Sequence, residues 1–363
     1  MTKYRLDQIG KVIGGGTPST RKKQYYANKG IAWITPKDLS GYSKMYISHG
    51  ARDISQEGLD NSSAKLLPKD TVLVSSRAPI GYVALAANKI TTNQGFKSIV
   101  PNTDIVLPKY LYYLMLTKKD ELENVSSGST FKEVSGRVMK GFEVDIPSLD
   151  KQANIIQKIE PITRKIELNY QINANLTKLR NLQYRQLINS NTVRKVKITE
   201  LFNIFYGKSL PKSKLINSGI QVFGANGLMG YTSEPSIIEK PTVTITSRGS
   251  GSGYVSYLDI GKAFLTNNLL YLDDKNNLGL SFAFEAIKAS NPNQFVTGSA
   301  QPQLTIKNLS RLDITAPVDR DVIDEFRKEM HPIESTMRNN NLENYELKKL
   351  KDTLLCKYFK QLN

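Results

Sequence analysis

The stretch KQANIIQKIEPITRKIELNYQINANLTKLRNLQYRQLINS, residues 151–190, decides the fold of this chain. Its apolar side chains recur every three or four residues, which places them on one face of a helix. These side chains are Ile155, Ile159, Ile162, Ile166, Leu176, Leu179 and Leu187. The opposite face carries mainly charged residues, among them Lys158, Arg164 and Lys178. The pattern predicts a long amphipathic helix whose apolar face needs a partner.

Pro161 lies inside this periodic stretch. Proline is tolerated in the first turn of a helix but is disruptive in a helix interior. We therefore expect a short helix at about residues 151–159, followed by a longer helix that starts near Pro161. The longer helix would have roughly 28 residues and a length of about 42 Å at 1.5 Å per residue.

A second stretch with the same pattern begins after Pro317 and runs to the end of the chain. Residues of the two stretches correspond at a spacing of 171 positions, so that Pro161 matches Pro332 and Asn169 matches Asn340. Two unrelated surface helices would not be expected to share prolines and asparagines in one register. We expect an antiparallel pair, in which the asparagines weaken packing but help to fix register. The expected seam consists of Ile162, Ile166, Leu176, Leu179, Ile333, Met337, Leu347 and Leu350.

The segments that precede the two helices also correspond. DTVLVSSRAPIGYV (70–83) is matched by PTVTITSRGSGSGYV (241–255), and FEVDIP (142–147) is matched by LDITAP (312–317). β-Branched and aromatic residues alternate there with glycine, proline and asparagine, which is typical of short strands and turns. The sequence thus predicts an α+β fold, built as a tandem duplication with an approximate two-fold axis. The alternative is a single domain over the whole chain.

This duplication divides the chain into four parts. Two β-rich globular domains are expected at residues 1–147 and 193–317, and helical spacer regions at 148–192 and 318–363. The helices would form an antiparallel coiled coil between the globular domains.

Composition points to an acidic partner. The chain has 363 residues, a formal net charge of +17 and an isoelectric point of about 9.6. Nucleic acid is the commonest partner of so basic a protein, although a membrane surface also fits the charge. There is no run of 18 apolar residues to span a membrane and no apolar segment at the N-terminus, so we expect a cytoplasmic protein.

Motifs for catalysis are incomplete. FYGKS (205–209) lacks the upstream glycine of a phosphate-binding loop, and GSGSG (249–253) lies between strands rather than before a long helix. SNPNQF (290–295) lacks the second proline of the tetrapeptide with which amino-methyltransferases hold a base. With one cysteine and two histidines, we expect no metal, no cofactor and no catalytic residue in this chain.

Binding chemistry remains. An arginine follows each β-rich run, and arginine grips a guanine edge or a phosphate with two hydrogen bonds. Amides at a similar distance downstream can read adenine edges, and each half has a basic loop near its start. Each residue could equally be an ordinary turn or surface residue; the repetition favours the binding role. The candidate DNA-binding residues are Arg21, Lys22, Lys23, Ser76, Arg77, Asn93, Gln94, Lys208, Lys212, Lys214, Ser247, Arg248, Ser250 and Asn267.

Over essentially its whole length the chain resembles the DNA-specificity subunit of type I restriction–modification systems. The resemblance rests on SRAPIGYV and SRGSGSGYV, on TNQ and TNN, on FEVDIP and LDITAP, and on the helix ends KLRNLQYRQLIN and KLKDTLLCKYFKQLN. It implies two target-recognition domains that each read half of a bipartite, asymmetric DNA site. It also implies that the helices set the spacer between the two halves.

The resemblance further implies partners for this chain. These are double-stranded DNA, two adenine-methylating modification subunits and, through them, the restriction and translocase subunits. S-adenosylmethionine, ATP and Mg²⁺ would belong to those partners. Two alternatives are a coiled-coil scaffold with protein- or glycan-binding domains, and a nuclease or methyltransferase with degenerate motifs.

Overall fold

The computed structural model describes residues 1–77, 79–128 and 132–360. The chain divides into two compact units. Unit 1 consists of Met1–Asn169 with Glu343–Asn363, and unit 2 consists of Tyr170–Leu342. The predicted domain ranges treat the helices as separate regions, whereas each compact unit includes part of both long helices.

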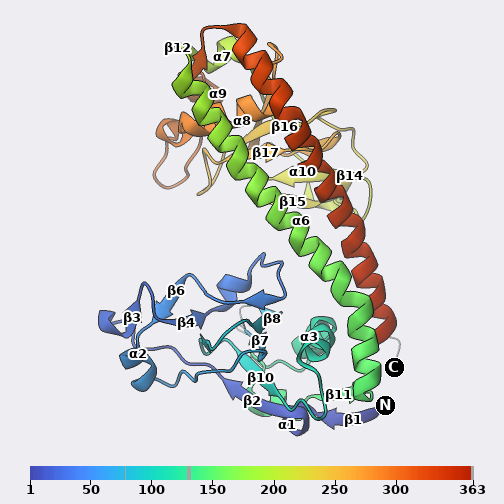
Figure 1. Ribbon diagram of the computed structural model, residues 1–363. Coiled ribbons are helices and arrows are strands. Elements are labelled where there is room, and N and C mark those ends of the chain that lie inside the picture. The colour runs from blue at the N-terminus through green and yellow to red at the C-terminus, as the bar shows by residue number, and fades with distance from the viewer. Residues whose placement is uncertain (78, 129–131, 361–363) are drawn as a thin grey trace. The chain divides into compact units, whose positions relative to one another are not determined.

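Unit 1 is built on a five-stranded and a four-stranded sheet (Figure 1). The first has the order β2-β10-β7-β8-β5, with β2 (Gly10–Gly14), β5 (Tyr46–Ile47), β7 (Val72–Ser76), β8 (Ile80–Ala86) and β10 (Lys97–Pro101). The second has the order β3-β6-β4-β9, with β3 (Tyr26–Ala27), β4 (Ile31–Ile34), β6 (Arg52–Ile54) and β9 (Thr91–Thr92). A separate antiparallel pair joins β1 (Thr2–Arg5) to β11 (Glu143–Ile146).

Helices α3 (Pro108–Thr117) and α4 (Lys119–Asn124) of unit 1 pack against strand β8 of the larger sheet. α3 starts with a proline, which suits a first turn, and its side chains from Tyr110 to Met115 are buried. α3 ends at Thr117, and α4 follows it after the single residue Lys118. The remaining helices are α1 (Leu6–Ile9), α2 (Gln56–Asp60) and α5 (Gly136–Gly141).

Unit 2 has the same order of principal elements. Its four-stranded sheet runs β13-β19-β16-β17, with β13 (Asn203–Tyr206), β16 (Thr242–Thr246), β17 (Val255–Leu258) and β19 (Leu269–Asp273). Its three-stranded sheet runs β15-β14-β18, with β14 (Ile220–Gly224), β15 (Gly227–Thr232) and β18 (Ala263–Leu265). β12 (Val193–Lys197) pairs with β20 (Asp313–Pro317), and the helices are α7 (Ile198–Leu201), α8 (Leu280–Ala289) and α9 (Ile306–Leu309).

Two long helices complete the chain, α6 (Leu149–Ser190) and α10 (Arg320–Leu355). The prediction that Pro161 starts a new helix is wrong, because α6 continues through it, as α10 continues through Pro332. An internal proline costs about 3 kcal/mol. Ile159 and Ile166, on either side of Pro161, are both buried, and each such side chain contributes about 1.5–3 kcal/mol. Burial on both sides therefore offsets the proline.

Within each unit, segments of α6 and α10 lie side by side, green and red in Figure 1, and polar side chains join them. In unit 1, Asn169 Nδ2 donates to Asn344 Oδ1 at 3.1 Å. In unit 2, Asn340 Nδ2 donates to Asn173 Oδ1 at 2.8 Å. Because the α10 partner numbers fall as the α6 numbers rise, the two helices run in opposite directions.

Part of the predicted seam is not buried. Ile166 and Met337 are buried, while Leu179 and Leu350 are 40% and 47% exposed. The other four predicted seam residues, Ile162, Leu176, Ile333 and Leu347, are partly buried.

The inward face of α6 beyond residue 173 explains the exposure of Leu179. That face follows Asn173, Arg180, Tyr184 and Leu187, all of them buried. It therefore passes through Arg180 rather than Leu179, one position away. Because the buried position holds a polar residue, the apolar periodicity predicted its neighbour Leu179 instead.

Candidate nucleic-acid interface

The turn that carries Arg77 is held at the end of β7 by a second turn. Ser76 N donates to Gly95 O at 2.7 Å, and Ser76 Oγ donates to the same oxygen at 3.2 Å. Asn93 Oδ1 accepts from Gly95 N at 2.9 Å, which closes the second turn. The structure thus brings Arg77 and the Asn93–Gln94 pair, 16 residues apart in sequence, to one edge of unit 1.

The N-terminal loop reaches the same edge. Thr17 Oγ1 donates to Gln94 Oε1, and Gly16 N donates to Thr92 O at 2.9 Å. A Cβ on Gly15 would stand 2.0 Å from Asn93 O, so only glycine permits this close approach.

A carboxylate joins the cations of this edge. Glu133 Oε2 lies 3.5 Å from Arg77 Nη1, and Glu133 Oε1 lies 3.1 Å from Lys97 Nζ. Glu133 is also bridged to Arg77 through the backbone. Beside this bridge is a hollow of about 740 Å³ whose lining includes Lys37, Arg77, Asn93 and Lys132. Carboxylate, amide and guanidinium groups together can read the edges of bases.

Unit 2 repeats this arrangement. Ser247 N donates to Asn268 O at 2.8 Å, and Ser247 Oγ donates to Asn267 O at 3.2 Å. Arg248 then follows, with its backbone bridged to Gln303 as that of Arg77 is bridged to Glu133. Asn267 N donates to Lys208 O at 3.1 Å, so the basic loop of unit 2 also reaches this edge.

The two edges differ in charge. Glu133 in unit 1 is replaced at the equivalent bridge of unit 2 by Gln303. Among the described residues, Arg248 forms no ion pair, and its side chain is exposed together with that of Ser250. The turn after Arg248 is closed by Ser252 Oγ, which donates to Gly249 O at 2.8 Å and to Pro302 O at 2.9 Å.

The basic loops are exposed to solvent. Arg21, Lys22 and Lys23 are all exposed, and Lys22 Nζ donates to Tyr25 Oη at 2.8 Å. That hydrogen bond raises the pKa of Lys22, so its charge is retained at neutral pH. In unit 2, Lys208 and Lys212 are exposed.

Lys214 has a local partner. It is exposed, and its Nζ pairs with Glu234 Oε1 at 2.5 Å. Because Glu234 partly neutralises Lys214, this residue should attract an anionic ligand less strongly than Lys208 and Lys212 do.

Ser76 and Ser247 require a correction. The sequence suggested them as DNA contacts, but both side chains are fully buried. Each hydroxyl lies at the end of a buried strand and donates a hydrogen bond to a backbone carbonyl of the neighbouring turn. These serines therefore hold the arginine turns in place and are not themselves exposed to a ligand.

Sequence reasoning missed several residues of these edges, among them Lys37, Lys97, Lys132, Glu133 and Gln303. Lys97 and Glu133 do not recur as the same residue types at the corresponding positions of the second half. Their equivalents in unit 2 differ in chemical type, so a search for matching residues could not select them. A comparison of unlike residues at matching positions would have found Glu133 and Gln303.

In the described part of the chain, no helix is long and apolar enough to cross a membrane.

Known proteins are similar to this chain in sequence. The MjaIX specificity subunit, a type I restriction enzyme subunit of Methanocaldococcus jannaschii, is 44% identical over 177 residues, which are 48% of this chain and 40% of that relative. The match therefore spans less than half of that relative. The EcoprrI specificity subunit of Escherichia coli is 23% identical over 335 residues, which are 86% of this chain and 82% of that relative.

A solved structure has a similar fold. The crystal structure of the S subunit of a type I restriction–modification system from M. genitalium matches with a TM-score of 0.60 and 19% identity. The match covers 98% of this chain and 94% of that one. The family model for the type I restriction modification DNA specificity domain matches residues 1–178 and 190–349. Because this family model matches well over half of the chain, the chain belongs to the type I restriction modification DNA specificity family.

Proposed function

We propose that this chain is the non-catalytic, sequence-specific DNA-recognition subunit of a type I restriction–modification complex. Each unit would read one half of a bipartite, asymmetric DNA site. The observation that carries the proposal is the repeated arginine turn, fastened in both units by the same serine-to-carbonyl hydrogen bonds. A net charge of +17 supplies the attraction to phosphates that provides much of the affinity for DNA.

The difference between the two edges supports an asymmetric target. A glutamate can accept a hydrogen bond from the N4 amino group of cytosine, whereas a glutamine pairs with the N6 and N7 positions of adenine. Glu133 and Gln303 occupy equivalent places beside Arg77 and Arg248. Two copies of one reading surface would instead favour identical half-sites.

The helices would set the distance between the half-sites. We propose that α6 and α10 act as an antiparallel coiled coil with approximate two-fold symmetry, which the asparagine contacts between them support. Two adenine-methylating modification subunits would dock on this chain, and restriction and translocase subunits would join through them. Those partners would bind S-adenosylmethionine, ATP and Mg²⁺.

Methylation mapping tests this proposal. The chain is expressed with a candidate modification subunit in a host without adenine methylation, and modified adenines are read across the genome. We expect a split motif with two different halves and a fixed gap. A short continuous palindrome would contradict the two-unit model, and absence of modification with any partner would favour a scaffold.

Arginine variants then assign the reading edges. Arg77→Ala should relax the motif in one half and Arg248→Ala in the other, each with a loss of about 1–3 kcal/mol in specific binding. Arg320→Ala is the matched control, because it removes the same charge from the exposed ion pair between Arg320 and Asp324 on α10. Unchanged motifs in both arginine variants would remove these residues from the interface.

A further inference from the structure

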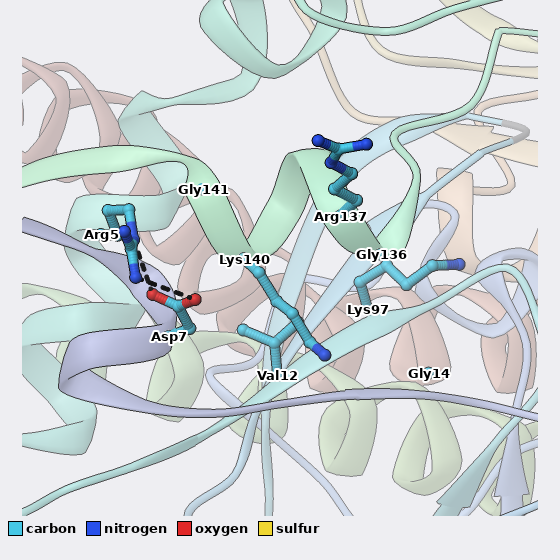
Figure 2. Close-up of a pocket in the computed structure, with 9 residues that line it drawn as sticks. All are labelled: Arg5, Asp7, Val12, Gly14, Lys97, Gly136, Arg137, Lys140 and Gly141. Atoms are coloured by element: carbon cyan, nitrogen blue, oxygen red, sulfur yellow. Dashed lines mark hydrogen bonds and ion pairs between the residues drawn. The ribbon is translucent and has the colours of Figure 1, made fainter.

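Unit 1 has a second hollow, and Lys97 is among the residues that line it (Figure 2). Its volume is about 720 Å³. Strands β2 and β10 and helix α5 form its walls, and its lining residues are Arg5, Asp7, Val12, Gly14, Lys97, Gly136, Arg137, Lys140 and Gly141. Lys97 belongs to this lining and also binds Glu133, so the hollow adjoins the reading edge described above.

The charge of this hollow is strongly positive. Its one carboxylate, Asp7, is already paired with Arg5 at 3.0 Å. Arg137 and Lys140 are exposed, and no ion pair engages either of them within the described ranges. Figure 2 shows Lys140 extending from α5 past Val12, while the guanidinium of Arg137 lies on the other side of the α5 ribbon. An anion in the hollow would therefore meet Lys140, a cation that forms no ion pair with any of the described residues.

Two glycines keep the hollow open. Gly14 and Gly136 line it, and a Cβ built on either would come no nearer than 3.9 Å to the Lys97 side chain. Neither glycine has a positive φ. The backbone therefore does not require glycine at these positions, and their effect is to leave space.

Unit 2 fills the equivalent space with a side chain. β13 pairs with β19 as β2 pairs with β10, so Tyr206 stands where unit 1 has Gly14. Its hydroxyl accepts a hydrogen bond at 3.1 Å from the backbone N of Ile306, the first residue of α9 as Gly136 is the first of α5.

Two of the cations are replaced there as well, whereas Arg137 keeps a cationic counterpart in Lys307. By the same strand and helix registers, Leu270 stands in place of Lys97 and Ser310 in place of Lys140. The hollow and the two cations Lys97 and Lys140 thus belong to unit 1 alone of the two equivalent places.

We propose that the hollow in unit 1 is a seat for a phosphate group of the DNA backbone, bound by Lys140 with Lys97 at its inner wall. The inference rests on the proposed function, because the hollow adjoins the edge that would read bases. Phosphate contacts fix register and orientation on the duplex, while base contacts specify sequence. The seat would align unit 1 on the duplex in a way that unit 2 does not share.

Salt-dependent binding tests the seat. The full chain, in complex with its modification subunit, is titrated with a duplex that contains the mapped site and with a scrambled duplex, each at several salt concentrations. Lys140→Ala should weaken both affinities roughly fivefold and reduce the slope of log K against log salt by about one. The ratio of the two affinities should not change. Lys307→Ala, which removes the unit 2 counterpart of Arg137, should leave affinity and slope unchanged.

Filling the hollow provides an independent variant. Gly14→Tyr introduces the residue that unit 2 has at this position and removes no charge. It should weaken binding to both duplexes as Lys140→Ala does. If Gly14→Tyr fails to fold, Lys140→Ala still decides the matter. Wild-type affinity and slope in Lys140→Ala would overturn the seat while leaving the proposed function intact. Failure of the wild-type complex to distinguish the two duplexes would overturn both.

Inorganic phosphate separates a DNA seat from a site for a free anion. It should compete with DNA at millimolar concentration in the wild type and less so in Lys140→Ala. If phosphate raises the melting temperature of the wild type but Lys140→Ala keeps full affinity for DNA, the hollow binds a free anion and the DNA assignment is overturned.

Discussion

The residue that best shows how chemistry shapes this chain is Arg180, which is 1% exposed. Its Nε donates to Glu285 Oε1 at 2.8 Å, and its guanidinium lies over the rings of Tyr257 and Phe284 at 4.3 and 4.5 Å. Asn181 Nδ2 donates to the other carboxylate oxygen at 2.8 Å. Buried charge survives here because it is paired, hydrogen-bonded and stacked.

Removing the carboxylate alone should be costly. We expect Glu285→Ala to lower the free energy of unfolding of unit 2 by about 3–5 kcal/mol, because it leaves Arg180 buried and uncompensated. Replacing both residues, as in Arg180→Met with Glu285→Leu, should cost less. Urea denaturation measures both. Asp313→Ala is the control, since its ion pair with Lys197 is about half exposed and should be worth less than about 1 kcal/mol. Equal losses in the single and double variants would refute this account.

Lys351 occupies in unit 1 the place that Arg180 occupies in unit 2, by the spacing of 171 positions. Burial lowers the pKa of Lys351 below its usual 10.5. The unfolded chain then binds this proton more tightly, so stability is reduced below the folded pKa and recovers as pH rises towards 10.5.

Lys351→Met should therefore stabilise unit 1 at pH 7, by about 0.5–2 kcal/mol. The advantage should shrink as pH approaches 10.5, where the wild-type lysine loses its charge in both states. Melting temperatures at pH 7 and pH 10 check this. An advantage that does not change with pH would show that packing, and not charge, is responsible.

At the scale of elements, the sequence pattern predicted the two long helices and the β-rich segments that precede them, and the structure contains both. It could do so because amphipathic periodicity is local and survives divergence. It failed at Pro161 and at Leu179 for tertiary reasons. The burial of Ile159 and Ile166 overrides a helix breaker, and the aromatic cage from β17 and α8 makes Arg180 an inward residue. The residues against which these α6 side chains pack lie elsewhere in the chain, so the sequence of α6 alone does not reveal them.

The asparagines of the helix pair should differ in their effects. Asn173 is satisfied, with bonds to Met337 O, Asn341 Oδ1 and Asn340 Nδ2. Asn169 Oδ1 and Asn344 Nδ2, by contrast, are buried without partners. We expect Asn173→Ala to cost about 1–3 kcal/mol, because it leaves buried polar groups unpaired.

Replacing both residues of the unsatisfied pair should have the opposite sign. Asn169→Leu with Asn344→Leu should raise the melting temperature, because the change removes two unsatisfied polar atoms and adds apolar contact. Differential scanning calorimetry of both variants measures the contrast. A loss of stability in the double leucine variant would mean that the hydrogen bonds from Asn169 Nδ2 to Asn344 Oδ1 at 3.1 Å and to Glu343 Oε2 at 2.7 Å outweigh the two unpaired atoms.

At the scale of the whole molecule, unit 1 combines two segments that are far apart in sequence, Met1–Asn169 and Glu343–Asn363. Leu355 and Phe359 belong to its buried core, and the ring of Phe359 lies 5.1 Å from that of Tyr110 on α3. The repeat alone did not predict this contact, since it requires knowing which helix end packs on which unit. The reading edges show the same limit: their arginine turns were found in the sequence, but their bridging glutamate and glutamine were not.

Phe359→Ala should therefore destabilise unit 1, although most of that unit comes from the N-terminal part of the sequence. A buried phenylalanine reduced to alanine costs about 3–5 kcal/mol. Hydrogen exchange should accelerate in α3 of unit 1 and stay unchanged in α8 of unit 2. Leu350→Ala is the control, because that side chain is largely exposed and its loss should leave α3 protected. If exchange in α3 does not change in Phe359→Ala, the C-terminal segment contributes little to unit 1. If α8 responds as strongly as α3, the two units unfold together rather than separately.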